Sequence, residues 1–153
     1  MIKKISANFS SLRDARIFLE MIFIVPVLQF FIRVFRLPRL MEWLTPSAVR
    51  LRRGENPEHK IQKIIKFADY ILDRNFWIYR KTCLKRSLLL YRFLRQAGID
   101  VQLCLGVKVI HDGTRKNLQG HAWLVYKDDI FLEKDIETTK TFNEGHRINF
   151  HPL

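Results

Sequence analysis

The sequence predicts an α+β fold in which helices come first and an antiparallel sheet follows. Apolar residues recur every three or four positions in the first part of the chain, which is typical of helices. From residue 101 onwards they alternate with polar residues, which is typical of strands. A chain of 153 residues, 48% of them hydrophobic, can bury one core. We therefore expect one compact unit, with an N-terminal helical extension over residues 1–56 and a core over residues 57–153.

The first predicted helix spans residues 10–36. Ser10 or Ser11 would cap its start, and Pro26 would kink or break it. Later elements follow from the same patterns. Their expected ranges are a helical turn over 40–45, a loop over 52–57, helices over 61–72 and 83–97, a strand over 101–109, a loop over 111–118, strands over 122–126 and 130–133 joined by a turn at 127–129, and a polar tail from 138 that adds one edge strand.

The apolar stretch over residues 17–35 is about long enough to span a bilayer, which takes roughly 20 residues. Glu20, Gln29 and Arg33 interrupt it. Three roles stay open for this segment. It could be a transmembrane helix, an interfacial helix that gives residues 17–36 peripheral membrane contact, or a helix packed on the domain or on a partner.

The overall charge and the cysteine count restrict the partners and the cellular location that we expect. A net charge of +12 suits an acidic partner, but the basic residues form no known nucleic-acid motif, so we expect no nucleic acid. The two cysteines lie in segments of opposite character, which favours free thiols and a cytoplasmic location, with membrane association as an option. Histidines and cysteines lack zinc-site spacing, so we expect neither a metal nor a cofactor.

Cys83 stands at the predicted start of the helix over residues 83–97, with Thr82 as its N-cap and Gly98 at its end. A helix N-terminus stabilises a thiolate, and the backbone N–H of Cys83 could serve as an oxyanion donor. The alternative is a small structural residue at a helix start. Cys104 lies within an alternating strand and is expected to be a packed structural thiol.

A cysteine nucleophile needs a base, and His121 is the best candidate. It begins a predicted strand between two small residues, Gly120 and Ala122, which leave room for a substrate or for the Cys83 helix. The other histidines lie in loops, at the start of a solvated helix or in the tail, and we expect them at the surface: His59, His111, His146 and His151.

Glu133 is the candidate for the acid that orients the histidine. If residues 127–129 form a three-residue hairpin loop, Trp123 faces Glu133, and His121 shares the face of Trp123. A two-residue turn at Asp128-Asp129 would instead place Glu133 on the opposite face. Asp135 has the same parity as Glu133 and is the reserve choice. We expect Trp123 to lie next to the substrate.

Three groups of residues resemble one known family. These are the segment from Thr82 to Tyr91, which reads TCLKRSLLLY, the pair Gly106-Val107, and His121-Ala122-Trp123. In this order they resemble the transglutaminase-like leader peptidases of lasso-peptide biosynthesis, the family of the C-terminal domain of the microcin-processing protein McjB. The resemblance covers nearly the whole chain. The loop over residues 111–118 is longer here than in the commonest version of that family.

The resemblance implies a papain/transglutaminase-like core and a cysteine peptidase that removes the leader from a lasso-type precursor peptide. It implies Cys83 as nucleophile, His121 as base and Glu133 as acid, although the family usually has Asp at this last position. The second oxyanion donor is not evident, and Trp77 and Tyr79 are candidates. The implied partners are the precursor peptide, a small leader-recognition protein and an asparagine-synthetase-like cyclase. The rival interpretations are another amidase or acyl transferase on the same fold, and a non-catalytic protein that binds a membrane or a partner.

Overall fold

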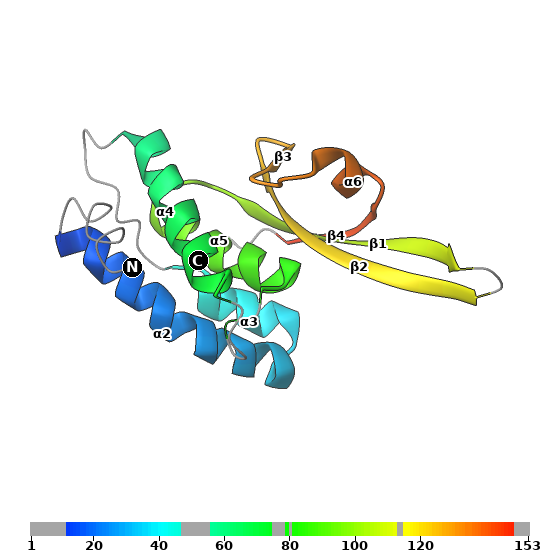
Figure 1. Cartoon of the computed structure of the whole chain (residues 1–153), viewed down its shortest axis with the longest axis horizontal. Coiled ribbons are helices and arrows are strands. Elements are labelled where there is room, and N and C mark those ends of the chain that lie inside the picture. The colour runs from blue at the N-terminus through cyan, green and yellow to red at the C-terminus, as the bar shows by residue number, and fades with distance from the viewer. Residues whose placement is uncertain (1–11, 47–55, 75–78, 80, 113–114, 149–153) are drawn as a thin grey trace.

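The computed structural model describes residues 12–46, 56–74, 79, 81–112 and 115–148. Helices precede strands, which confirms the predicted α+β class (Figure 1). The elements in chain order are α2 (Leu12–Val34), α3 (Leu37–Leu44), α4 (Pro57–Leu72), α5 (Cys83–Gln96), β1 (Gln102–Asp112), β2 (Arg115–Tyr126), β3 (Asp129–Phe131), α6 (Ile136–Lys140) and β4 (Asn143–Ile148).

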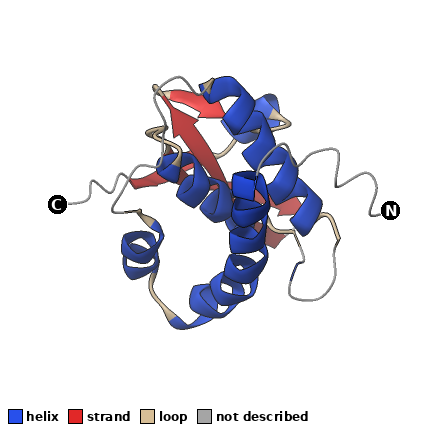
Figure 2. Ribbon diagram, turned by 90° about the vertical axis from the view of Figure 1, so that its left-hand side faces the viewer, coloured by secondary structure: helices blue, strands red, loops and turns tan. Residues whose placement is uncertain are grey.

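Helices α2 to α5 gather on one side of the sheet, and Figure 2 shows them in front of the strands. Helix α5 contacts α2, α3 and α4 as well as β1 and β2. It is therefore the central element of the molecule. An apolar sequence run from Leu88 to Leu90 suits this position, because every side of the helix meets another part of the protein.

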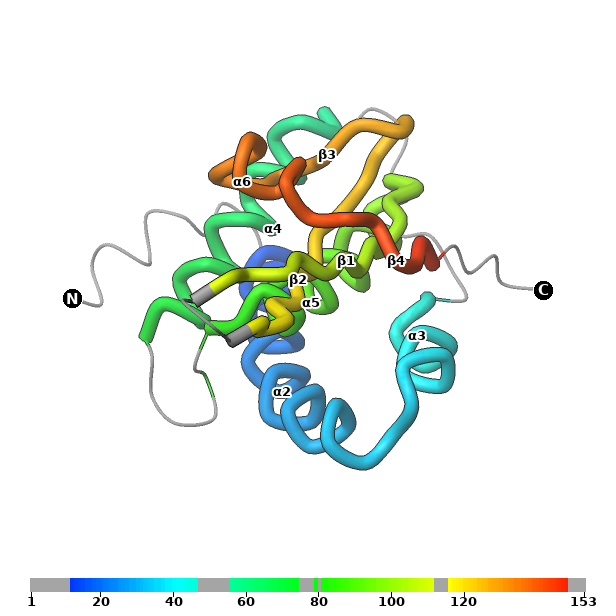
Figure 3. The backbone as a smooth tube through the Cα atoms, turned by 90° about the vertical axis from the view of Figure 1, so that its right-hand side faces the viewer, coloured from blue at the N-terminus to red at the C-terminus, as the bar shows by residue number. Residues whose placement is uncertain are grey.

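The sheet is antiparallel, with strand order β3-β2-β1-β4. Strands β1 and β2 form a long hairpin whose inner part crosses over α5 and whose outer part extends beyond the helices (Figures 1 and 3). In its register Gly106 pairs with His121 and Leu105 with Ala122. Strand β4 pairs with β1, so the expected edge strand in the tail is confirmed.

Local sequence explains where α5 begins and ends. The Thr82 hydroxyl accepts a hydrogen bond from the Lys85 N–H (3.2 Å), which confirms Thr82 as the N-cap. Gly98 has a φ of 82°, a left-handed conformation that glycine adopts without steric cost. Similarly, Asn56 caps α4 by accepting from the Glu58 N–H, and Pro57 occupies the first turn.

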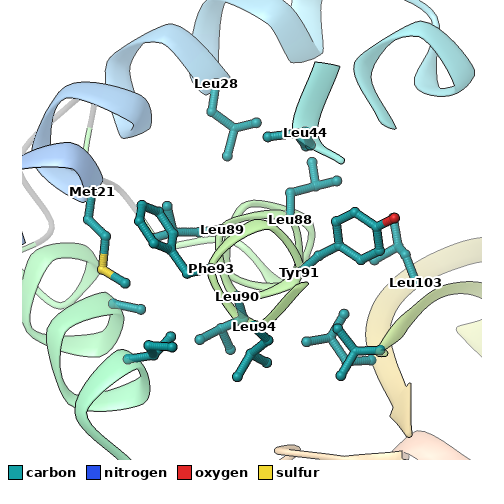
Figure 4. Close-up of a cluster of buried hydrophobic side chains, with 14 of the residues drawn as sticks. Met21, Leu28, Leu44, Leu88, Leu89, Leu90, Tyr91, Phe93, Leu94 and Leu103 are labelled. Carbon is teal, nitrogen blue, oxygen red and sulfur yellow. The ribbon is translucent and has the colours of Figure 1, made fainter. Parts of the chain in front are cut away.

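One hydrophobic core joins the N-terminal helices to the rest of the chain. Met21, Val25 and Leu28 of α2 are fully buried and belong to the same cluster as Leu88 of α5 and Leu103 of β1. Figure 4 shows Met21, Leu28, Leu88 and Leu103 among the core side chains arranged around α5. A second, smaller cluster on the other face of the sheet contains Cys104, Trp123, Val125 and Phe142.

Four expectations about local structure were wrong. Helix α2 continues through Pro26, so the predicted break at this residue is absent. Helix α3 begins at Leu37 and not at residue 40, because proline is tolerated in a first turn. Most of the expected loop over residues 111–118 is paired hairpin; it looked like a loop because this part is solvated and polar. Helix α6 was not expected. The predicted caps Ser10 and Ser11 lie outside the described residues.

Candidate functional site

Cys83 is the first residue of α5, and its side chain is exposed. The first N–H groups of a helix have no acceptor within the helix, and Thr82 caps only the N–H of Lys85. The helix therefore offers no acceptor to the N–H of Cys83 itself, and its partial positive charge lies beside the sulfur. An exposed thiol at this position can meet a substrate from solvent.

Cys104 has the opposite environment. It is fully buried in the second cluster, as expected for a structural thiol. Burial, followed by the charge of Glu144, raises the pKa of its thiol to about 11. Cys104 is therefore a protonated and inaccessible thiol at neutral pH, and only Cys83 of the two cysteines can act as a nucleophile in the folded protein.

His121 and Glu133 lie together. Nε2 of His121 is 3.4 Å from Oε2 of Glu133, and the two side chains are only 21% and 15% exposed. A carboxylate in this position fixes the orientation of an imidazole and stabilises its protonated form. Because Nε2 faces the acid, Nδ1 of His121 remains for a second partner.

The route by which Glu133 reaches His121 differs from the predicted one. The turn consists of Lys127 and Asp128, which both have positive φ values of 52° and 66°, and Tyr126 pairs with Asp129. Strand alternation in this register would place Glu133 on the face opposite to His121. Pairing stops at Phe131, however, and Leu132 adopts a left-handed φ of 63° that redirects the chain.

Arg86 holds the redirected segment in place. Its Nη1 donates to the Leu132 carbonyl (3.0 Å) and lies 3.9 Å from Oε1 of Glu133. Its Nε donates to Oδ1 of Asp69 in α4 (2.8 Å). One nearly buried guanidinium thus links α4, α5 and the segment that carries Glu133. The sequence does not predict this role of Arg86. Its one hint is a charged residue within an apolar helix, three residues after Cys83.

The surroundings of Asp69, the acid partner of Arg86, favour its ionised form. Burial opposes ionisation of Asp69, but hydrogen bonds and charges from Arg86 and Lys81 outweigh it and hold the pKa of the carboxyl below its usual range. Lys81 also contacts Asp73 (2.6 Å), and these partners keep the pKa of Lys81 above its usual value despite partial burial. Lys81 and Arg86, two basic residues near Cys83 in sequence, are therefore engaged in ion pairs.

The imidazole of His121 rests on aromatic side chains. Its ring stacks on Trp123 with centroids 5.8 Å apart and packs against Phe142 at 5.1 Å. A Cβ atom at Gly106 would lie 2.6 Å from Cη2 of Trp123, so only glycine leaves room for the indole. Trp123 is almost fully buried beneath His121. It can therefore influence a substrate only through this imidazole.

The first turns of α5 lie against the strand that carries His121. The Ser87 hydroxyl donates to the carbonyl of Ala122 (3.0 Å), and Arg86 reaches Glu133. Ser87 follows Cys83 by one helical turn, and Ala122 follows His121 directly. These contacts place the first turns of α5, the helix that begins with Cys83, against the strand of His121 and the segment of Glu133.

Comparison with known families now identifies the group. The family model for the "Transglutaminase-like superfamily" matches residues 25–145, well over half of the chain. The chain belongs to the transglutaminase-like superfamily. Its members are typically cysteine hydrolases, which agrees with a Cys-His-acid arrangement. No curated protein and no solved structure matches the chain significantly.

Other candidate residues of this transglutaminase-like protein have different places. The Asp135 carboxylate caps α6 by accepting from the Thr138 N–H (2.9 Å). A hydrogen bond from the Thr138 hydroxyl, followed by this backbone one, lowers the pKa of Asp135. Glu133 rather than Asp135 is therefore the acid beside His121. The Tyr79 hydroxyl lies 3.5 Å from the Ile22 carbonyl in α2, a contact that an oxyanion role for the hydroxyl would have to break. Trp77 lies outside the described residues.

The remaining histidines do not join the site of the transglutaminase-like core. His59 in α4, His111 in the hairpin and His146 in β4 are exposed, as expected, and His151 lies outside the described residues. Within the described part of the chain, no group of three or more histidine, cysteine or acidic residues could hold a metal ion. The chemistry available at this site is that of a thiol, an imidazole and a carboxylate.

Proposed function

We propose that this chain is a cysteine peptidase that cleaves a peptide bond through a thioester. The observation that carries the proposal is the His121–Glu133 pair, 3.4 Å apart and largely shielded from solvent, beside the helix that begins with Cys83. In this arrangement Cys83 is the nucleophile, His121 the general base and acid, and Glu133 the orienting acid.

The reaction would proceed in two stages. His121 takes the proton of the Cys83 thiol at Nδ1, and the sulfur attacks the scissile carbonyl carbon. The C–N bond breaks, the leaving nitrogen takes the proton from the imidazole, and an acyl thioester remains. His121 then deprotonates a water molecule that attacks the thioester, the C–S bond breaks, and the sulfur regains a proton. The Cys83 N–H would donate one hydrogen bond to each oxyanion.

The substrate that we propose is the leader region of a lasso-type precursor peptide. Support comes from the order of three motifs, TCLKRS at Thr82–Ser87, Gly106-Val107 and His121-Ala122-Trp123. The backbone next to His121 is also open enough for a peptide to approach, because a Cβ atom at Gly120 would meet nothing within 4 Å. The partners in this proposal are the precursor, a small leader-recognition protein and a cyclase that acts after cleavage, in the cytoplasm.

The test uses the precursor peptide encoded next to this gene, mixed with the chain and the leader-recognition protein. Release of the leader is measured by mass spectrometry. We expect no cleavage by Cys83→Ala, a loss of about 10²-fold or more for His121→Ala, and a smaller loss for Glu133→Ala. Asp135→Ala is the matched control, since it removes a nearby carboxylate that caps α6 instead of contacting His121. It should keep cleavage near the wild-type rate. Cleavage that survives Cys83→Ala would contradict the proposal.

A second measurement separates the alternatives. Release of a free carboxylate in plain buffer indicates hydrolysis, whereas product formation only with an added amine would indicate an acyl transferase on the same fold. Thiol alkylation addresses a non-catalytic role. We expect Cys83 to react in the folded protein and Cys104 only after unfolding, because Cys104 is buried. A Cys83 thiol as inert as Cys104 would favour a binding protein.

A further inference from the structure

Helix α2 carries a stripe of exposed apolar side chains along the side that faces away from the protein. Leu12, Leu19, Phe23, Phe30 and Val34 are 93%, 52%, 71%, 60% and 58% exposed. Their spacings of seven, four, seven and four residues place them on one side of a helix that turns every 3.6 residues. A surface of this kind is unusual for a protein that stays in solution.

The opposite side of α2 is fixed to the core. Met21, Val25 and Leu28 are fully buried against the rest of the protein, and Asp14 forms an ion pair with Lys63 of α4 (2.7 Å). By length and hydropathy alone α2 could cross a membrane, since its best window has a mean hydropathy of 2.1. Spanning a bilayer would, however, require these core contacts to break. The stripe is therefore suited to a surface on which the folded protein can rest.

The charges around the stripe indicate which surface this is. Exposed arginines lie beside it and just beyond its C-terminal end, and these are Arg16, Arg33, Arg36 and Arg39. The chain as a whole has a net charge of +12. Trp43 of α3, which is 41% exposed, packs against Phe31 of α2 with ring centroids 4.9 Å apart. Apolar and aromatic side chains flanked by arginines are the composition of a helix at the surface of an anionic membrane.

We propose that α2 docks the folded protein on an anionic membrane as an interfacial helix. Phe23 and Phe30 enter the boundary between headgroups and acyl chains, while the arginines contact lipid phosphates. The attraction between these basic residues and the anionic surface weakens as salt is added. The proposed active site stays open, because α2 and the sheet contact different sides of α5 (Figure 4).

Vesicle sedimentation of the full chain tests this inference. The two preparations are pure phosphatidylcholine vesicles and vesicles of equal parts phosphatidylcholine and phosphatidylglycerol. We expect binding to the second preparation, weakened by added salt, and much weaker binding to the first. The double variant Phe23→Ser/Phe30→Ser should lower the partition coefficient about tenfold or more, because it removes two aromatic rings from the contact. Equal binding of the wild type to both preparations, or no binding to the anionic vesicles, would overturn the proposal.

The matched control is Val109→Ser/Leu118→Ser. These residues are 47% and 76% exposed and pair across the outer part of the β1–β2 hairpin. This variant also loses two exposed apolar side chains and should bind anionic vesicles like wild type. Equal loss in both variants would mean non-specific adsorption. Light scattering could instead show a dimer of the wild type that dissociates in Phe23→Ser/Phe30→Ser. Such a dimer, together with no vesicle binding, would assign the stripe to contact with a second copy and refute membrane docking. Circular dichroism confirms that each variant folds.

Discussion

Two helices of this protein, α2 and α5, are apolar on most sides and lie in opposite environments. Helix α5 is enclosed by other elements, and even its polar residues Arg86 and Ser87 are buried and hydrogen-bonded. In contrast, α2 buries four residues of its 23 and exposes phenylalanines to solvent. The more hydrophobic of the two helices is thus the more exposed one. In α5 the apolar side chains hold the proposed site together, whereas in α2 they form a surface for an external partner.

The largest contrast should come from an arginine in each helix. Arg86→Met removes one of the two basic partners of the largely buried Asp69 and should destabilise the protein by roughly 3 kcal/mol. Arg16→Met removes an exposed pair with Glu20 and should cost less than about 1 kcal/mol. Urea unfolding measures both. Equal costs would mean that burial does not distinguish these two ion pairs.

Arg86 also positions Glu133, and a conservative change can separate this role from stability. Arg86→Lys keeps a charge near Asp69 but lacks the forked guanidinium that reaches the Leu132 carbonyl as well. We expect it to recover much of the stability lost in Arg86→Met and still show slower cleavage with an altered pH–rate profile, because His121 is less firmly held. Wild-type kinetics in this variant would leave Arg86 with a purely structural role.

A pair of leucines sharpens the same comparison. Leu89 of α5 is fully buried, whereas Leu19 of α2 belongs to the exposed stripe. Leu89→Ala should cost about 2–5 kcal/mol because it leaves a cavity, and Leu19→Ala should stay within about 0.5 kcal/mol of wild type. Thermal unfolding, analysed with the same heat-capacity change of unfolding for both variants, gives the two changes in stability. A large cost at Leu19 would show that the stripe is covered in solution.

A smaller effect is expected from acid. The pKa of Asp69 is lower in the folded protein than in the unfolded chain, so its ionised form stabilises the fold at pH values above about 4. This contribution disappears as pH falls through the folded pKa. Asp69→Asn should be less stable than wild type at neutral pH and lose less stability on acidification. Urea midpoints between pH 7 and the acid limit test the sign, and parallel curves would refute it.

The smallest effect should come from the stripe itself. In the absence of membranes, Phe23→Ser/Phe30→Ser should change stability by less than about 0.5 kcal/mol and leave cleavage of a soluble precursor unchanged, because both rings are exposed and distant from the sheet. Thermal unfolding and the cleavage assay provide the check. A marked loss in either would place these side chains inside the folding or catalytic unit.

Much of the fold could be predicted because the signals are local. Thr82 and Gly98 bound α5 through their own side-chain and backbone properties, and alternation between Val101 and Val109 indicates a strand whatever it packs on. The outer hairpin was mistaken for a loop because solvated strands lack this alternation. Helix α6 was missed because its five residues carry no apolar period, and its start depends on one cap, Asp135.

The sequence by itself determined the α+β class, the position of Cys83 at the start of a helix, and the position of His121 on a strand, directly after Gly120. Only the tertiary structure decided how the acid reaches that histidine. A two-residue turn at Lys127-Asp128 shifts the register, and the left-handed Leu132, held by Arg86, returns Glu133 to His121. Caps and periodicity act within a few residues, whereas register, burial and ion pairing depend on contacts between distant segments. For the same reason, hydropathy alone would predict the wrong order of burial, because α2 is more hydrophobic than α5 and yet more exposed.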